Sequence, residues 1–377
     1  MQHIKRILYK IHIWNRRPVI LWIDHSLGGG TATYSKTQFK KLNRKYDIKR
    51  LQYFPHDKTY QLTSVSKFEP TYRTQDINQM YGTCLQYQPS AIVVNNLVGY
   101  ASTLRMLQFV CKLKNNILPR PKVSFRGHDF QCVCPSYNLI NCDGMYCNLA
   151  HKNGCEACWA NKRLSSDDKA HNILKSGAST IKQWRCAWQD FLENTADEII
   201  VFSQSTKEIL TQTYKNILDK IQIIPHTTKK YKRVKIKHHD DINIGVLGQI
   251  SFAKGADIIH QMSNDLNNHK NVNIIIIGTT CNPNQKLKIH GKYKPYHLPK
   301  IIKSYNIDLI FIPSIWPETF SYTTSEAMAM GIPVACYDMG APAERVANYK
   351  YGLVLPNISP SENLKQIIQF IQSIKRH

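Results

Sequence analysis

Apolar residues along this chain fall into short continuous runs, each followed by a polar or glycine-rich turn and then by a segment with helical spacing. The first run covers residues 19–23 and ends at Asp24, and three glycines follow at 28–30 before a helical pattern begins near Thr33. Continuous apolar runs of strand length are typical of strands buried on both faces. Strand, glycine loop and helix in this order predict the start of a doubly wound α/β domain.

The same alternation continues along the rest of the chain. In the first half, strands are predicted at residues 91–95, 123–125, 198–202 and 221–224, and helices at 181–192 and 205–214. The basic segment 229–239 has no apolar periodicity, which is typical of a linker. After it, strands are predicted at 242–247, 272–277, 307–313 and 333–337, and helices from 256, at 321–330 and at 363–374. The pattern predicts two Rossmann-like α/β domains, 1–228 and 240–377, that face a cleft.

Length and composition limit the class of protein. The chain has 377 residues, 42% of them hydrophobic, so each half can bury a core. The longest apolar runs, such as 19–23 and 309–312, are far shorter than the about 20 residues that span a bilayer. Basic residues interrupt the N-terminus at Lys5, Arg6, Lys10, Arg16 and Arg17. Because these charges rule out a secretory signal, a cytoplasmic location is predicted.

The net charge of +24 indicates an acidic partner, which would be nucleic acid, an anionic membrane surface or a phosphorylated substrate. Lysines spread over a surface for solubility explain the same charge equally well. The first 17 residues interleave Ile4, Leu8, Ile11 and Trp14 with basic residues. This pattern predicts an amphipathic helix, which either docks on an anionic membrane or packs on its own domain.

The segment 317–334 carries the most informative chemistry. It follows a buried-strand pattern and predicts a loop that enters a helix ending at Gly331. Glu318 lies in the loop and Glu326 lies inside the helix. The amides of the first turn, around Ser321, would form an anion site suited to a diphosphate, and a nearby carboxylate could bind a ribose diol. The alternative is a helix with an acidic first turn and no ligand.

These residues carry a family resemblance. Glu318 and Glu326, with the string Ala-Met-Ala-Met-Gly-Ile-Pro-Val that begins directly after Glu326, resemble the signature of the retaining GT-B glycosyltransferases of family 4, also called group 1. The stretch 245–255 resembles the family's first loop of the C-terminal domain, where an arginine and a lysine hold the donor diphosphate. Lys254 matches the lysine, whereas Gln249 stands where the family has arginine. The stretches 223–226 and 340–344 resemble further family segments, so nearly the whole chain is covered.

The resemblance implies a GT-B fold and transfer of a hexose, with retention, from a nucleotide-diphosphate sugar to a glycan or glycolipid acceptor. It also implies that catalysis needs no metal or other cofactor. Glu318 would position the sugar hydroxyls, Glu326 would hold the ribose, and Lys254 with the helix N-terminus would stabilise the leaving diphosphate. The remaining implied donor-binding residues are Gly248, Gln249, Phe320, Ser321 and Tyr322.

Two further candidates lie in the N-terminal half. His128 follows a predicted strand at the position of the family's cleft histidine, so the resemblance implies that it contacts the transferred sugar. Gly29 and Gly30 occupy the position of the family's glycine-rich loop, where the backbone approaches the donor or the acceptor. Taken alone, a histidine or a run of glycines in a turn is typical of turns without any ligand.

Cysteines concentrate in a predicted insertion near residues 130–165. Cys155 and Cys158 have the C-x2-C spacing that supplies half of a zinc site, and Cys134 and Cys147 would complete a set of four thiolates. Such a zinc ion would be structural, because four thiolates leave no open coordination position. The alternative is a group of reduced, buried cysteines in a long loop.

Two other classes of function stay open. A sugar-nucleotide epimerase or phosphorylase would share the two-domain architecture. A nucleic-acid-binding protein would suit the net charge, but the basic residues show no aromatic pattern typical of RNA recognition, so no nucleic-acid partner is predicted. The setting that the resemblance and the charge favour is polysaccharide or lipopolysaccharide synthesis for the cell envelope, by an enzyme peripheral on the inner face of the membrane.

Overall fold

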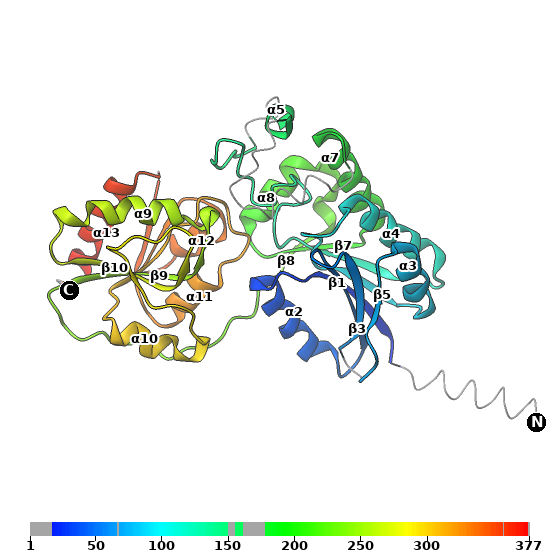
Figure 1. Cartoon of the computed structure of the whole chain (residues 1–377), viewed down its shortest axis with the longest axis horizontal. Coiled ribbons are helices and arrows are strands. Elements are labelled where there is room, and N and C mark those ends of the chain that lie inside the picture. The colour runs from blue at the N-terminus through cyan, green and yellow to red at the C-terminus, as the bar shows by residue number, and fades with distance from the viewer. Residues whose placement is uncertain (1–16, 66–67, 150–154, 161–177, 357, 376–377) are drawn as a thin grey trace, which may run out of the picture. The chain divides into compact units, whose positions relative to one another are not determined.

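The computed structural model describes residues 17–65, 68–149, 155–160, 178–356 and 358–375. Within these ranges the chain forms two β-sheets, each with helices packed on it (Figure 1). By its internal contacts the chain divides into two compact units, 1–127 with 172–200 and 216–222, and 128–171 with 201–215 and 223–377. In the sequence, the predicted linker lies between the last strand of the first sheet and the first strand of the second. The second unit also includes residues 128–171 and 201–215, which precede this linker. The domain boundaries at 228 and 240 therefore stay a prediction.

The first sheet has eight strands in the order β4-β3-β2-β1-β5-β6-β7-β8. Its strands are β1 (Val19–His25), β2 (Asp47–Phe54), β3 (Thr59–Ser64), β4 (Tyr72–Thr74), β5 (Ala91–Val94), β6 (Lys122–Arg126), β7 (Glu198–Val201) and β8 (Ile221–Ile223). Strands β1, β2, β5, β6 and β7 pair in parallel, while β3 pairs antiparallel with β2 and β4. The helices of the same compact unit are α2 (Gly29–Leu42), α3 (Ile77–Gln86), α4 (Thr103–Asn116) and α7 (Ile181–Asp190). Helices α5 (Cys155–Ala160) and α8 (Gln204–Thr213) come from the same half of the sequence but belong to the second unit. Parallel pairing requires such crossover helices, as the sequence pattern predicted.

Five elements between residues 47 and 116 were not predicted, namely β2, β3, β4, α3 and α4. Strand β2 shows why, because it buries charged side chains. Lys49 is only 2% exposed and forms ion pairs with Asp47 and Glu69, and Arg50 pairs with Asp24 at 2.7 Å. Such charges remove the apolar run that marks a buried strand, and their partners lie elsewhere in the sequence.

The second sheet has six strands in the order β11-β10-β9-β12-β13-β14. Its strands are β9 (Ile242–Ile250), β10 (Val272–Thr280), β11 (Lys288–Ile289), β12 (Leu309–Ile312), β13 (Val334–Tyr337) and β14 (Gly352–Leu355), and each pair is parallel. The helices are α9 (Ala256–Asp265), α10 (Leu298–Ser304), α11 (Tyr322–Ala329), α12 (Gly340–Val346) and α13 (Pro360–Lys375). The strands and helices predicted here are confirmed to within a few residues, and Gly331 follows α11 with a φ of 75°.

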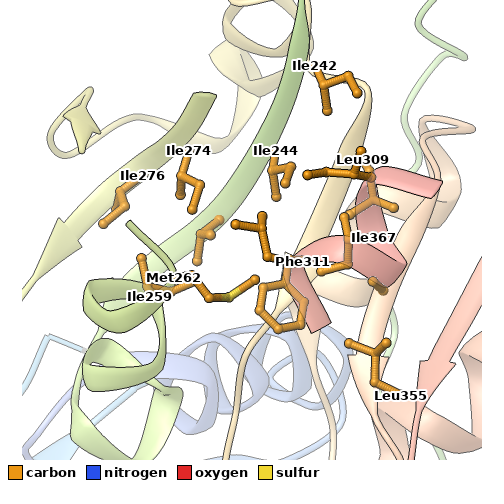
Figure 2. Packing of buried hydrophobic residues seen from close by; sticks show 14 of the residues in the cluster. Ile242, Ile244, Ile259, Met262, Ile274, Ile276, Leu309, Phe311, Leu355 and Ile367 are labelled. Carbon is orange, nitrogen blue, oxygen red and sulfur yellow. The ribbon is translucent and has the colours of Figure 1, made fainter. Parts of the chain in front are cut away.

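Hydrophobic side chains cover both faces of this sheet. On one face Ile274 and Ile276 pack with Ile259 and Met262 of α9 and with Ile367 of α13 (Figure 2). On the other face the alternate residues of the same strand, Ile275 and Ile277, pack with side chains of α10, α11 and α12. Successive side chains of a strand point to opposite faces, so a strand with helices on both sides needs an unbroken apolar sequence.

The basic segment 229–239 is more than the bare linker that was predicted. It contains no helix or strand, but Tyr231, Val234 and Ile236 pack against the second hydrophobic cluster. The Val234 amide donates to the carbonyl of Met330 at 2.8 Å. The basic side chains between these apolar residues, such as Lys232 and Lys235, are exposed. The segment 229–239, called the strap below, therefore packs its apolar side chains against this hydrophobic cluster and exposes its basic side chains to solvent.

No helix among the described residues combines the length and the apolar character that crossing a bilayer requires. The amphipathic helix predicted near the N-terminus falls on residues 1–16, which lie outside the described residues. Its docking on a membrane therefore stays a prediction.

Candidate functional site

The site begins where two loops meet at the carboxyl ends of β9 and β12. These strands are parallel neighbours, so the loops that follow them lie at the same edge of the sheet. The Ile315 amide donates to the Ala253 carbonyl at 3.0 Å. Gly255 has a φ of 80°, and a Cβ there would lie 2.1 Å from the Pro313 carbonyl oxygen, so this close approach of the loops requires glycine. The contact brings Lys254 of the first loop toward Glu318 of the second.

Glu318 is a buried carboxylate held from several directions. It is 5% exposed, and the Ser314 hydroxyl donates to it. Lys254 Nζ lies 3.9 Å from Glu318 Oε1 and keeps more than a third of its side chain in solvent. The Ala341 amide, at the start of α12, donates to the Glu318 carbonyl at 2.8 Å. The loop therefore presents one buried carboxylate with a partly exposed cation beside it.

The N-terminus of α11 follows directly after this loop. Ser321 is its N-cap, and Ser321 Oγ accepts the Thr324 amide at 3.4 Å. The first turn contains no acidic residue, so the acidic turn of the alternative is wrong, while the binding of an anion there stays a prediction. A Cβ on Gly248 would lie 3.8 Å from the Thr323 methyl group, which places Gly248 beside the same turn. The next residue of β9, Gln249, is exposed. First-turn amides have no partner within their helix and attract anions.

Glu326 lies one helical turn beyond Thr323 on α11. The Tyr231 hydroxyl donates to Glu326 Oε1 at 3.3 Å. Burial raises the pKa of the Glu326 carboxyl, while the Tyr231 hydrogen bond and the nearby Lys229 charge act to lower that pKa. Sequence reasoning missed Tyr231 and Lys229, and the only signal for them was the basic segment itself. The first residues of the strap therefore lie near Glu326, the carboxylate predicted to hold the ribose.

His128 belongs to the same compact unit as Glu318. Its carbonyl accepts the Thr319 hydroxyl at 2.7 Å, so the residue next to Glu318 is tied to the backbone of His128. The His128 ring centroid lies 4.6 Å from that of Phe202 and 5.3 Å from that of His226. The sequence offered no role for Phe202, and His226 was only the last residue of a stretch with family resemblance.

His226 is the centre of a cluster of rings that reaches α11. It is 9% exposed, and its ring centroid lies 4.4 Å from that of Phe320 and 5.3 Å from that of Tyr322. The Arg345 guanidinium lies over the Phe320 ring, 4.6 Å from its centroid. His128, Phe320, Ser321 and Tyr322, which were predicted separately, are therefore brought together with Glu318.

Residues 227–377 match the family model described as glycosyl transferases group 1. The match covers this part of the chain and no residue before 227. The matched range contains both loops, Glu318, Glu326 and all of the second sheet. The family resemblance drawn from Glu318, Glu326 and the string after them is thereby confirmed at the level of group 1. A search of curated protein sequences found no match.

Solved structures extend the likeness to most of the chain. Sucrose-phosphate synthase from Thermosynechococcus elongatus is 13% identical, with a TM-score of 0.60 over 94% of this chain and 90% of that one. HepE from Anabaena, solved with UDP-glucose, is 14% identical, with a TM-score of 0.58 over 95% and 90% of the two chains. The lipopolysaccharide outer core galactosyltransferase WaaB, in its apo form, is 12% identical, with a TM-score of 0.56 over 94% and 90%. At these identities the likeness is one of fold, and it confirms the predicted GT-B class with two Rossmann-like domains.

Gly29 and Gly30 lie in the other compact unit. They form the start of α2, which begins earlier than the predicted Thr33. Gly28 and Gly29 have φ angles of 85° and 75°, and a Cβ at either position would meet nothing within 4 Å. The glycines are therefore required by the turn into α2, while a contact with the donor stays a prediction.

The cysteine-rich insertion brings together some of the predicted cysteines, but not all four. The Cys142 amide donates to Cys158 Sγ at 3.2 Å, and burial with the neighbouring Cys142 and Cys155 raises the pKa of the Cys158 thiol to about 11. Cys142 was not in the predicted set of Cys134, Cys147, Cys155 and Cys158. Among the residues that the structure describes, no three cysteine, histidine or carboxylate side chains are arranged around one metal position. The structural zinc ion stays a prediction.

The compact unit that contains His226 is expected to lose stability in mild acid. Burial, with a smaller effect of the Arg345 charge, lowers the pKa of His226 from 6.5 to about 3. The folded chain then binds fewer protons than the unfolded chain, so the stabilisation is complete above pH 6.5 and decreases as the pH falls. The expected loss between pH 6.5 and pH 5 is about 2 kcal/mol.

Denaturant unfolding of the wild type and of His226→Phe at these two pH values measures this effect. The phenylalanine keeps a ring in the cluster but cannot be protonated, so its pH dependence should be smaller by about 2 kcal/mol. The matched control is His297→Phe at an exposed position, which should retain the full pH dependence of the wild type. Equal pH dependence of all three chains would show that His226 titrates normally.

Proposed function

We propose that this chain transfers a hexose, with retention of anomeric configuration, from a nucleotide-diphosphate sugar to a hydroxyl group of a glycan or glycolipid. The observation that carries the proposal is the meeting of Lys254, Glu318 and the N-terminus of α11 at one edge of the sheet. A lysine and a helix N-terminus attract a diphosphate, and a buried carboxylate beside them is placed to hold the sugar. The group 1 family match supports the reaction class.

The proposed reaction exchanges one bond for another at the anomeric carbon. The bond from this carbon to the diphosphate oxygen breaks, and its electron pair stays with the diphosphate. The acceptor oxygen forms the new bond on the same face, and its proton passes to the departing phosphate oxygen. Lys254 and the amides after Ser321 stabilise the charge that grows on the diphosphate, while Glu318 positions the sugar hydroxyls. His128 contacts the sugar, and no metal ion takes part.

Glu326 is proposed to bind the ribose of the donor. Two hydrogen bonds from a ribose diol to one carboxylate are charge-assisted and directional. Tyr231 and Lys229 support this role because they hold the carboxylate from the strap side. HepE, which shares the fold, was solved with UDP-glucose, so UDP and UDP-glucose are the first probes. Phe320, Tyr322, Gly248 and Gln249 border the same turn and are proposed donor contacts.

The acceptor side of the proposal rests on charge. A net charge of +24 and the exposed basic face of the strap favour an acceptor carried at an anionic membrane, with the enzyme on its cytoplasmic side. WaaB, which shares the fold, is named for lipopolysaccharide outer core synthesis. We therefore propose a role in polysaccharide or lipopolysaccharide assembly.

A binding screen tests the donor site. Thermal shift and calorimetry with UDP, GDP, ADP, CMP, dTDP and their sugars should select one base, and Glu326→Ala should weaken its binding by about 10- to 100-fold. Glu362→Ala, in the exposed first turn of α13, is the matched control and should bind like the wild type. The absence of binding by any nucleotide would refute the proposal.

Product analysis then separates the reaction types. A transferase forms a new glycoside only with an acceptor, whereas an epimerase converts the donor alone and a phosphorylase requires inorganic phosphate. The anomeric configuration of the first product, read from proton couplings by NMR, should be that of the donor. An inverted product would remove the retaining mechanism but leave the donor site in place.

A further inference from the structure

Arg345 is a cation near the proposed donor site that has no role in the proposed mechanism. It lies near the end of α12, and its guanidinium reaches the first turn of α11. Nη2 donates to the Ser321 carbonyl at 3.1 Å, Nε donates to the Ala341 carbonyl at 3.1 Å, and Nη1 donates to the Ser325 hydroxyl. With its plane over Phe320, the group is held on several sides. A side chain fixed this firmly acts on α11 from one defined position.

All three hydrogen-bond acceptors of Arg345 are neutral. No carboxylate within the described parts of the chain comes within the 4.0 Å of an ion pair with its guanidinium. The neighbouring Glu344 uses its carboxylate to accept the amides of Gln204 and Ser205 at the start of α8. Burial lowers the pKa of Arg345, while the more distant charges of Glu318 and Glu344 act to raise it. A desolvated cation without a contacting anion favours the arrival of one.

The charges around Arg345 balance in number but not in contact. Lys254 and Arg345 are two cations, and the carboxylates of Glu318 and Glu344 are the two anions near them. Within the described parts of the chain neither carboxylate forms an ion pair with Arg345, whose guanidinium lies beside the N-terminus of α11. The first-turn amides of α11 also favour an anion. A group with two negative charges close together, such as a diphosphate, is attracted by both features more strongly than a neutral ligand is.

The residues of β9 next to the first turn of α11 carry no charge. Gly248 lies beside Thr323, and the next residue, Gln249, is exposed and neutral. Position 249 follows Gly248 at the carboxyl end of β9, so a cation introduced there would lie within reach of the same turn. This gives a place where a lost charge can be restored without rebuilding the contacts of Arg345.

We propose that Arg345 is a positioning residue for the donor diphosphate. It holds the turn at Ser321 in place and supplies, from behind that turn, the second positive charge of the diphosphate site. The inference rests on the proposed function, since it specifies how the same donor site binds phosphate. In this proposal Arg345 supplies the positive charge that Gln249, a neutral residue, does not supply.

The test compares a nucleoside diphosphate with its nucleoside. Calorimetry with UDP and uridine, or with the pair of the base that the screen selects, is carried out on Arg345→Gln, on Gln249→Arg and on the double variant. Arg345→Gln should weaken diphosphate binding by about 10- to 100-fold at low salt and nucleoside binding by less than about threefold. Gln249→Arg should restore at least a tenth of the wild-type diphosphate affinity to Arg345→Gln and strengthen it in the otherwise wild-type chain.

Several results would overturn the inference. Equal losses for the diphosphate and the nucleoside would mean that Arg345 only maintains the fold of the site, and so would a double variant as weak as Arg345→Gln. Should Arg345→Gln fail to fold, Arg345→Lys takes its place, because lysine keeps the charge but cannot reproduce the guanidinium contacts. It should bind the diphosphate within about fivefold of the wild type, and a loss above about tenfold contradicts the charge role. A wild type that binds no nucleotide refutes the proposed function itself, which is a different outcome from all of these.

Discussion

Glu318→Gln is expected to lower the rate of sugar transfer by about 10²- to 10³-fold while donor binding and the fold are retained. Glutamine has the shape of glutamate, and its amide oxygen can still accept the Ser314 hydroxyl. The substitution removes the one negative charge between Lys254 and the reacting sugar. In the proposed mechanism this carboxylate orients the sugar hydroxyls and opposes the positive charge that develops at the anomeric carbon, so its loss affects kcat.

Three measurements on purified Glu318→Gln separate these effects. The value of kcat comes from product formation at saturating donor, the donor Kd from calorimetry, and the fold from the temperature of unfolding. Glu362→Gln, which removes an exposed carboxylate from α13, serves as the matched control and should leave all three unchanged. A kcat within threefold of the wild type would exclude Glu318 from the catalytic machinery. A loss of donor binding alone would instead place Glu318 among the donor-binding groups.

Gly340→Ala is expected to destabilise the chain by about 2–4 kcal/mol and to lower transfer by about 100-fold. Gly340 begins α12 with a φ of 66°, and a Cβ there would lie 2.6 Å from the backbone of Pro317 and 2.7 Å from the Glu318 nitrogen. These neighbours are backbone atoms and cannot rotate away. The methyl group must therefore push the Glu318 loop from α12 and break the hydrogen bond from the Ala341 amide to the Glu318 carbonyl.

Two other glycines separate backbone strain from the steric clash. Gly291 has a φ of 86°, but a Cβ there meets nothing within 4 Å, so Gly291→Ala should show only the cost of the left-handed backbone, about 1–2 kcal/mol. Gly82 lies inside α3 with open space around it, and Gly82→Ala should stabilise the chain by about 0.5–1 kcal/mol. Denaturant unfolding and kcat are measured for all three variants. Transfer by Gly340→Ala at the rate of Gly291→Ala would show that the clash does not reach Glu318.

Helix α12 connects these predictions. Its first residue faces the Glu318 loop, Glu344 binds the amides at the start of α8, and Arg345 binds the turn before α11. One short helix thus contacts the Glu318 loop and the N-termini of two other helices. A substitution in α12 should therefore change transfer and donor binding more than a similar substitution on an exposed helix such as α13.

Much of this protein follows from its sequence alone. The strands of the second sheet are apolar without interruption because helices cover both of their faces, and that pattern is local. The start of α11 at Ser321 and its end before Gly331 follow from the preferences of a cap residue and of glycine for particular backbone angles. Glu318 and Glu326 were recognisable from their places in the loop and the helix and from the family signature that they resemble, whereas Lys254 was recognisable only because 245–255 resembles a loop of that family.

What only the tertiary structure decided concerns contacts between residues that are distant in the sequence. Strand β2 was hidden because the buried Lys49 and the partly buried Arg50 pair with Glu69 and Asp24, which are distant in the sequence, and no local pattern shows such a partner. His226 and Arg345 look like ordinary loop and helix residues until the fold brings them to Phe320. Ion pairs and ring contacts act over a few ångströms in space, so the sequence shows which groups are present and only the fold shows which of them meet.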